Sequence, residues 1–416
     1  MSKHARDRRP YVKPVTKLEL SESNIKFRWI AIAVLLSIAV VSIGYGFSLA
    51  LRTEPGWQEV TPLSQEVNCS SDFMLMYEFD SSESNPTAEY KKLETAYQSL
   101  TVSAYRLFNP EAEGTDNLYA LNHNVNHAVT VAPELYRALE QVVKSGSRHV
   151  FMAPVLELYG SVFLSATDAE AAHYDPTKDP EQAALAQEMS SYCADPQMVS
   201  LELLGENKAC LRVSGEYLSY AQEYGIEVFM NFGWMKNAFI ADYMADALAE
   251  QGFTRGYLAS SDGFTRNLDI RGTEFTVNLF HREGNDVRMP ANLVYNGPMS
   301  IVSLRDYPMF EQDKWNYYAY ENGSFTSVYL DPADGMCRTS IDCITAYSRE
   351  KGCAEIALEL APVFISESFD AEALERLDHE GIESVRYSGK SLVCTDEASP
   401  LLIADEAYDI VISQIK

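Results

Sequence analysis

The residue types best suited to phosphate and cation chemistry gather in two stretches that lie far apart along the chain. The first contains Asn-Phe-Gly-Trp-Met-Lys-Asn at 231–237 and Ser-Ser-Asp at 260–262. Lysines such as Lys236 neutralise phosphate as a compact positive charge, and carboxylates such as Asp262 bind hard cations. A lone lysine at a helix start is ordinarily solvated, however, and an aspartate in a turn commonly caps its own backbone. Both interpretations stay open for these two residues.

The second stretch combines a turn with a pair of glutamates. Asp331-Pro332 and Gly335 form the turn, and Glu355 and Glu359 follow it. Residues four apart project from one face of a helix, so the two glutamates could together hold a cation if that face borders a pocket. The alternative is a solvated acidic face. We therefore treat Lys236 and Asp331 as candidate catalytic residues and Glu355 and Glu359 as candidate metal ligands.

Hydrophobic periodicity predicts the elements that position these residues. Helices are expected at 88–103, 133–144, 235–251 and 371–379, the third of them stopped by Gly252. Strands are expected at 73–79, 256–259, 275–279, 324–329, 384–387 and 392–394. Helices mixed with antiparallel strands, without regular βαβ alternation, predict an α+β fold.

The N-terminal region predicts a membrane anchor. Residues 29–51 form an uncharged apolar run, long enough to cross roughly 30 Å of hydrocarbon. The basic leader at 1–28 predicts a cytoplasmic N-terminus and an extracytoplasmic remainder at the cell membrane. The expected organisation is a leader at 1–28, a transmembrane helix at 29–51, a juxtamembrane linker at 52–69, a main domain at 70–397 and a C-terminal extension at 398–416.

Charge and cysteine usage narrow the function classes. Residues 1–52 hold 9 of the 33 basic and 3 of the 60 acidic residues, so residues 53–416 carry a net charge of −33. Such a negative field repels phosphate backbones, which disfavours nucleic-acid binding. All seven cysteines follow the apolar run, and Cys337 with Cys343, Cys193 with Cys210, and Cys353 with Cys394 could pair in an oxidising compartment.

Aromatic residues between 315 and 320 allow two interpretations. Trp315, Tyr317, Tyr318 and Tyr320 could stack a planar ring. Aromatics at alternate positions are more often sheet core or cross-strand pairs.

The order of short motifs resembles that of the ApbE-type FAD:protein FMN transferases over residues 70–397. The blocks that carry the resemblance are Ser103-Ala104-Tyr105, 116–122, Phe151-Met152-Ala153-Pro154 with Tyr159-Gly160, Lys236, Ser260-Ser261-Asp262, Asp331-Pro332 with Gly335, and Ala354 to Glu359.

This resemblance implies an enzyme that holds FAD with Mg²⁺ at its pyrophosphate and moves FMN onto a Ser or Thr of an envelope flavoprotein. The cofactor-binding residues it implies are Lys236, Ser260, Ser261, Asp262, Asp306, Asp331 and Gly335, and the metal ligands are Glu355 and Glu359.

Several family residues are replaced in this chain, which leaves catalysis open. Gly-Gly has become Ser260-Ser261, Thr-Ser-Gly has become Ser303-Leu304-Arg305 before Asp306, and a histidine has become Val328. A Cβ obstructs the close approach of backbone N–H groups to phosphate oxygens. Three hypotheses remain: a divergent transferase, a catalytically inactive relative that binds a flavin or a protein, and an unrelated solute-binding ectodomain.

Overall fold

The computed structural model describes residues 25–50, 53–82, 85–398 and 400–413. The chain divides into two compact units, Met1–Glu54 and Pro55–Lys416. The first unit contains helix α1 (Ile25–Ala50). Across the residues that the structure describes, no helix is both long and apolar enough to cross a membrane. The membrane-spanning helix at 29–51 therefore stays a prediction, and residues 1–24 of the predicted leader lie outside the described residues.

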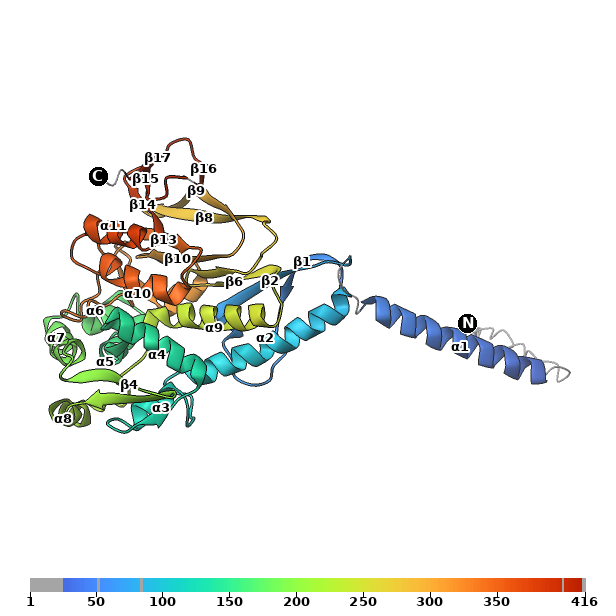
Figure 1. The fold of residues 1–416 in the computed structure, drawn as a ribbon, viewed down its shortest axis with the longest axis horizontal. Coiled ribbons are helices and arrows are strands. Elements are labelled where there is room, and N and C mark those ends of the chain that lie inside the picture. Colours follow the sequence, from blue (N-terminus) through green and yellow to red (C-terminus); the bar gives the residue numbers. More distant parts are fainter. Residues whose placement is uncertain (1–24, 51–52, 83–84, 399, 414–416) are drawn as a thin grey trace, which may run out of the picture. The chain divides into compact units, whose positions relative to one another are not determined.

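The second unit is built on a nine-stranded sheet in the order β1-β2-β6-β7-β10-β13-β14-β15-β17 (Figure 1). Every neighbouring pair in this sheet is antiparallel except β15 and β17. The strands are β1 (Gly56–Val60), β2 (Phe73–Phe79), β6 (Gly256–Ser260), β7 (Phe264–Asn267), β10 (Met299–Arg305), β13 (Cys343–Ser348), β14 (Glu383–Ser388), β15 (Ser391–Cys394) and β17 (Asp409–Ile412).

Three smaller sheets complete the strand inventory of the described chain. They are β16-β9-β8, β3-β5-β4 and β11-β12. Their strands are β3 (Val129–Thr130), β4 (Val199–Gly205), β5 (Lys208–Val213), β8 (Glu274–Glu283), β9 (Asp286–Asn296), β11 (Tyr317–Ala319), β12 (Phe325–Ser327) and β16 (Leu401–Ile403). Together with the helices, these mostly antiparallel sheets confirm the α+β class.

The helices of this unit are α2 (Pro86–Phe108), α3 (Leu118–His123), α4 (Pro133–Ser145), α5 (Ala153–Phe163), α6 (Asp168–Tyr174), α7 (Pro180–Ala194), α8 (Gly215–Tyr224), α9 (Lys236–Glu250), α10 (Cys353–Phe364) and α11 (Ala371–His379). Short 3-10 turns lie at η2 (Ser70–Asp72), η3 (His149–Phe151), η4 (Gly233–Met235) and η5 (Glu311–Trp315). The helices expected at 88–103, 133–144, 235–251 and 371–379 are confirmed as α2, α4, α9 and α11.

Helix α9 is the central helix of the core. Its apolar side chains, including Phe239, Met244 and Leu248, are at most 2 % exposed. It contacts β6 and β7 on one side and α2 and α10 on others. Gly252 ends it with a φ of +85°, a conformation that glycine adopts without a Cβ penalty. Because α9 is fixed on several sides, its first residue, Lys236, has a well-defined position.

Both predicted flanking segments of the main domain contain strands of the central sheet. The segment at 52–69, expected as a linker, contains β1, which pairs with β2 along its whole length. The segment at 398–416, expected as an extension, contains β16 and β17, which pair with β9 and β15. The domain limits at 70 and 397 stay a prediction. Sequence periodicity did not indicate these edge strands, because short edge strands gain their stability from pairing rather than from a periodic pattern of their own.

None of the seven cysteines, all of which lie in the described part of the chain, is in a disulfide. The pairs considered from sequence are therefore not formed. Six of the thiols are buried and Cys337 is partly exposed. Burial raises the pKa of Cys69 to about 12, which keeps this thiol protonated and inert.

Candidate functional site

A cavity of about 650 Å³, called the cleft below, opens beside the first turn of α9. Its volume falls within the roughly 300–1,000 Å³ of small-molecule sites. Segments that are distant in sequence meet there. The lining residues lie in 71–72, 109–111, 156–163, 231–237, 261–262, 312–316 and at Val328.

Asp262 and Asn237 both line the cleft and are joined by a hydrogen bond. Asn237 is 7 % exposed, and its Nδ2 donates a hydrogen bond of 2.9 Å to Asp262 Oδ2. Asp262 Oδ1 and Asn237 Oδ1 are both buried, and neither of these two oxygens has a hydrogen-bond partner among the described residues. Burial raises the pKa of Asp262 to about 6, although hydrogen bonds from Ser260 and Asn237 act to lower it. We call the two Oδ1 atoms the acceptor pair.

The turn that carries Asp262 depends on Gly263. This glycine has a φ of +107°, and a Cβ on it would lie 2.2 Å from the carbonyl oxygen of Ser303. Ser260 Oγ accepts a hydrogen bond from the backbone N–H of Phe264 at 3.0 Å. Ser260 therefore holds the turn together, whereas Ser261 and Asp262 line the cleft.

Lys236 supplies the positive charge that lines the cleft. Its Nζ lies 3.9 Å from Asp72 Oδ2, and the two side chains are 38 % and 37 % exposed. Lys236 is also the first residue of α9, whose preceding residue, Met235, provides no side-chain cap. The exposed ammonium and the positive end of the helix dipole thus lie together, an arrangement that favours an anion.

The aromatic residues expected between 315 and 320 divide into two groups. Tyr317 and Tyr320 are each 7 % exposed and belong to the core, as expected if they pack within the sheet rather than stack a ligand ring. Trp315 is 61 % exposed and lines the cleft. Trp234 lines it as well, and its buried Nε1–H has no acceptor in the described part of the chain.

Asp331 and Gly335 lie in a self-contained turn outside the cleft. The Asp331 carboxylate accepts a hydrogen bond from Ala333 N at 2.9 Å and lies 3.4 Å from Arg338. Gly335 has a φ of +75°, and a Cβ there would lie 2.7 Å from the carbonyl oxygen of Ala186. The turn thus packs against α7, and the structure does not bring Asp331 together with Lys236.

Asp306 is also separated from the cleft. It follows β10, and its Oδ1 is buried without a hydrogen-bond partner in the described residues. Burial, reinforced by the charge of Asp342, raises the pKa of Asp306 to about 7.

Of the two predicted metal ligands, Glu355 is paired with lysines. Glu355 Oε1 lies 2.8 Å from Lys351 Nζ and 3.5 Å from Lys144 Nζ. These lysines lower the pKa of Glu355 against the effect of burial, whereas partial burial and Glu380 raise the pKa of Glu359. Neither glutamate lines the cleft. Among the described residues, no group of three or more His, Cys, Asp or Glu side chains is arranged to hold a metal. The pair at 355 and 359 does not suit Mg²⁺.

Sequence reasoning missed Asp72 and Asp242. Asp72 reaches the cleft from η2, and no motif marks it. Asp242 lies in the buried face of α9, where its carboxylate accepts hydrogen bonds of 2.8 Å from the backbone N–H groups of Cys353 and Ala354 and pairs with Arg266. A single acidic residue in an otherwise apolar helical stripe was the available signal for Asp242.

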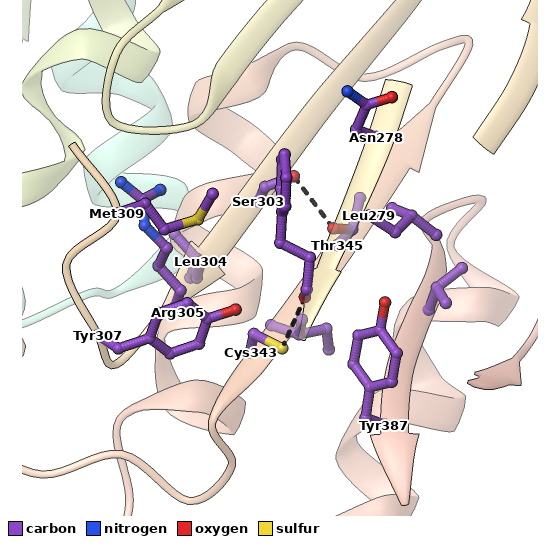
Figure 2. Close-up of a pocket in the computed structure, with 13 residues that line it drawn as sticks. Asn278, Leu279, Ser303, Leu304, Arg305, Tyr307, Met309, Cys343, Thr345 and Tyr387 are labelled. Carbon is purple, nitrogen blue, oxygen red and sulfur yellow. Dashed lines mark hydrogen bonds between the residues drawn. The ribbon is translucent and has the colours of Figure 1, made fainter. Parts of the chain in front are cut away.

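A second cavity lies between β8 and strands β10, β13 and β14 (Figure 2). Its volume is about 40 Å³, which leaves room for water and not for a nucleotide. Ser303 Oγ and Thr345 Oγ1 are 3.0 Å apart beside it. The Ser303-Leu304-Arg305 block therefore contributes to the packing of the sheet rather than to the cleft.

Comparisons with known proteins show what this architecture is similar to. The sequence matches no model of a known protein family and no curated protein. The structure, however, is similar to the ApbE protein of Thermotoga maritima, with a TM-score of 0.54 at 12 % identity over 85 % of this chain and 97 % of that one.

The flavin transferase ApbE of Vibrio cholerae is similar too. Its TM-score is 0.52 at 11 % identity, over 83 % of this chain and 95 % of that one. A mutant of the same protein gives 0.54 at 11 % identity, over 84 % and 100 %. At such low identity the likeness establishes the fold, and the protein has an ApbE-like fold.

Proposed function

We propose that the cleft binds a flavin nucleotide, with FAD as the ligand, in a membrane-anchored extracytoplasmic protein. One observation carries this proposal: Lys236 at the start of α9, the acceptor pair, and the exposed ring of Trp315 all line the same cleft. The ApbE-like fold supports it, because two of the similar structures are flavin transferases. The apolar run at 29–51 and the basic leader support the anchor.

Each cleft residue has a role toward such a ligand. Trp315 offers a flat apolar face for the ring, since aromatic stacking tolerates any planar partner. Lys236 and the first turn of α9 neutralise phosphate oxygens. Asp72, whose Oδ2 lies 3.9 Å from Lys236 Nζ, helps to position this ammonium. Bound FAD would supply a pyrophosphate bond whose cleavage releases FMN.

Transfer of FMN to a Ser or Thr of an envelope flavoprotein is the second candidate function. The fold shared with the Vibrio cholerae flavin transferase favours it. Three features favour instead a relative that binds FAD without transferring FMN. They are the serines in place of glycines at 260 and 261, the pairing of Glu355 with lysines, and the packing role of Ser303. FAD cleavage measured on the full-length protein separates these two functions.

Binding is tested by titrating the protein with FAD and following flavin and tryptophan fluorescence. Lys236→Gln is expected to weaken FAD binding about tenfold, or ~1.4 kcal/mol, because it removes the charge on the phosphates. Lys208→Gln removes the same charge from β5, outside the cleft, and should leave the affinity unchanged. Absence of FAD binding to the wild-type protein at high micromolar concentration would refute the proposal.

A further inference from the structure

A serine hydroxyl lies near the ammonium at the start of α9. Ser71 belongs to η2, is exposed, and lines the cleft. Its Oγ donates a hydrogen bond of 3.3 Å to Asp72 Oδ1, and the other oxygen of that carboxylate lies 3.9 Å from Lys236 Nζ. One carboxylate therefore contacts both the hydroxyl and the ammonium. Asp72 and Lys236 are 37 % and 38 % exposed, so a ligand in the cleft can contact all three side chains.

The backbone around Ser71 is fixed to the elements that form the cleft. The N–H of Ser261 donates a hydrogen bond of 3.1 Å to the carbonyl oxygen of Asp72. Strand β2 begins at Phe73, directly after η2, and Phe73 pairs with Ser260 at the end of β6. The sheet thus holds Ser71 in a defined position beside the phosphate-binding end of α9.

This arrangement suits a hydroxyl group that attacks phosphorus. A serine hydroxyl is a weak nucleophile until a neighbouring base accepts its proton. In phosphoryl transfer by protein kinases, an aspartate accepts the proton of the attacking hydroxyl, and positive groups stabilise the charge on the phosphoryl oxygens. Asp72 is placed for the first role, and Lys236 with the first turn of α9 is placed for the second.

We propose that Ser71 receives FMN from FAD, so that the protein attaches a flavin covalently to its own chain. Ser71 Oγ forms a bond to the phosphorus of the FMN half while the pyrophosphate P–O bond breaks. AMP leaves with the bridging oxygen, and the hydroxyl proton passes to Asp72. FAD and the serine are the only reactants. This inference rests on the proposed binding of FAD in the cleft and adds the residue to which FMN becomes attached.

Covalent attachment is measured on the full-length protein after incubation with FAD in a buffer that contains Mg²⁺. We expect flavin fluorescence that stays with the denatured chain, and an FMN adduct on the peptide that contains Ser71. Ser71→Ala should abolish the adduct, whereas Ser71→Thr keeps a hydroxyl and should retain it. Asp72→Asn should slow attachment about a hundredfold or more, as the loss of a general base does.

Ser391 provides a matched control outside the cleft. Its hydroxyl donates a hydrogen bond of 2.7 Å to Asp409 Oδ1, so it has the same kind of partner as Ser71. Ser391→Ala should leave the rate of attachment unchanged, and the peptide that contains Ser391 should carry no flavin. Dilution of the protein tests whether each chain modifies itself, because the rate constant should then be independent of protein concentration.

The outcomes separate this inference from the flavin proposal. Bound FAD that stays intact, FAD cleavage that yields only free FMN, or an adduct that persists in Ser71→Ala overturns the role of Ser71 and leaves FAD binding in the cleft intact. A rate constant that rises in proportion to protein concentration also overturns it, because the hydroxyl then comes from another molecule. Absence of FAD binding refutes both proposals.

Discussion

At the scale of single residues, burial raises the pKa of two carboxyl groups, Asp262 to about 6 and Asp306 to about 7. Asp262 and Asp306 each keep a buried oxygen without a hydrogen-bond partner among the described residues. The two unpartnered oxygens have different consequences, because Asp262 lines the cleft and Asp306 does not. A ligand can satisfy Asp262, whereas Asp306 remains in a poorly solvated position beside Asp342. We therefore expect Asp306 to affect stability rather than binding.

Asp306→Asn should stabilise the protein at about pH 8. Burial raises the pKa of Asp306 from 3.8 to about 7. Between about pH 4 and pH 7 the unfolded chain has lost this proton while the folded protein retains it, so the contribution of Asp306 to stability falls as the pH rises. It then stays low above about pH 7. Asp306→Asn removes this loss of stability. The difference in the free energy of unfolding between the variant and the wild type should therefore shrink as the pH falls toward about 4.

Urea unfolding of both proteins across this pH range measures the difference. A variant that is less stable than the wild type at about pH 8, or whose advantage does not change with pH, would contradict the assigned environment of Asp306.

At the scale of elements, α9 couples the cleft to α10. Lys236 and Asn237 in its first turn line the cleft. Two turns later, the Asp242 carboxylate binds the first backbone N–H groups of α10 and the guanidinium of Arg266. A Cβ on Gly352 would lie 2.3 Å from Asp242 Oδ2, so the chain before α10 also approaches this carboxylate closely. The position of α10 therefore depends on Asp242.

Asp242→Ala should destabilise the protein by about 3–5 kcal/mol. It leaves the first N–H groups of α10 buried without an acceptor and leaves the Arg266 charge with only the exposed Asp246 as a partner. Asp246→Ala is the matched control. Asp246 lies 2.9 Å from the same arginine but is 57 % exposed, so its loss should cost no more than about 1 kcal/mol. Equal urea midpoints for the two variants would show that Asp242 does not hold α10.

Periodic elements and local motifs were predictable from the sequence, and long-range contacts were not. The apolar stripe of α9 and the alternation of β2 gave their positions, and Lys236, Ser261 and Asp262 do meet in one cleft. Asp72 was not predicted because it comes from a short turn with no periodicity. The glutamate at 355 was assigned without its partner Lys144, which lies 211 residues away in sequence. No local pattern encodes such a contact.

At the scale of the whole molecule, the net charge of −33 over residues 53–416 opposes an anionic ligand. The proposed FAD ligand would therefore be held by local contacts rather than by the overall field. The walls of the cleft come from segments far apart in sequence, which the nine-stranded sheet and α9 bring together. Bound FAD should accordingly contact segments that are separate in the sequence but adjacent in the structure.

Amide hydrogen exchange with and without saturating FAD tests the location of the site most directly. We predict slower exchange at 231–237, 260–263 and 312–316, and unchanged exchange in the turn at 331–335 and at the start of α10. Protection confined to other segments, or no protection while FAD is bound, would contradict the assignment of the cleft as the flavin site.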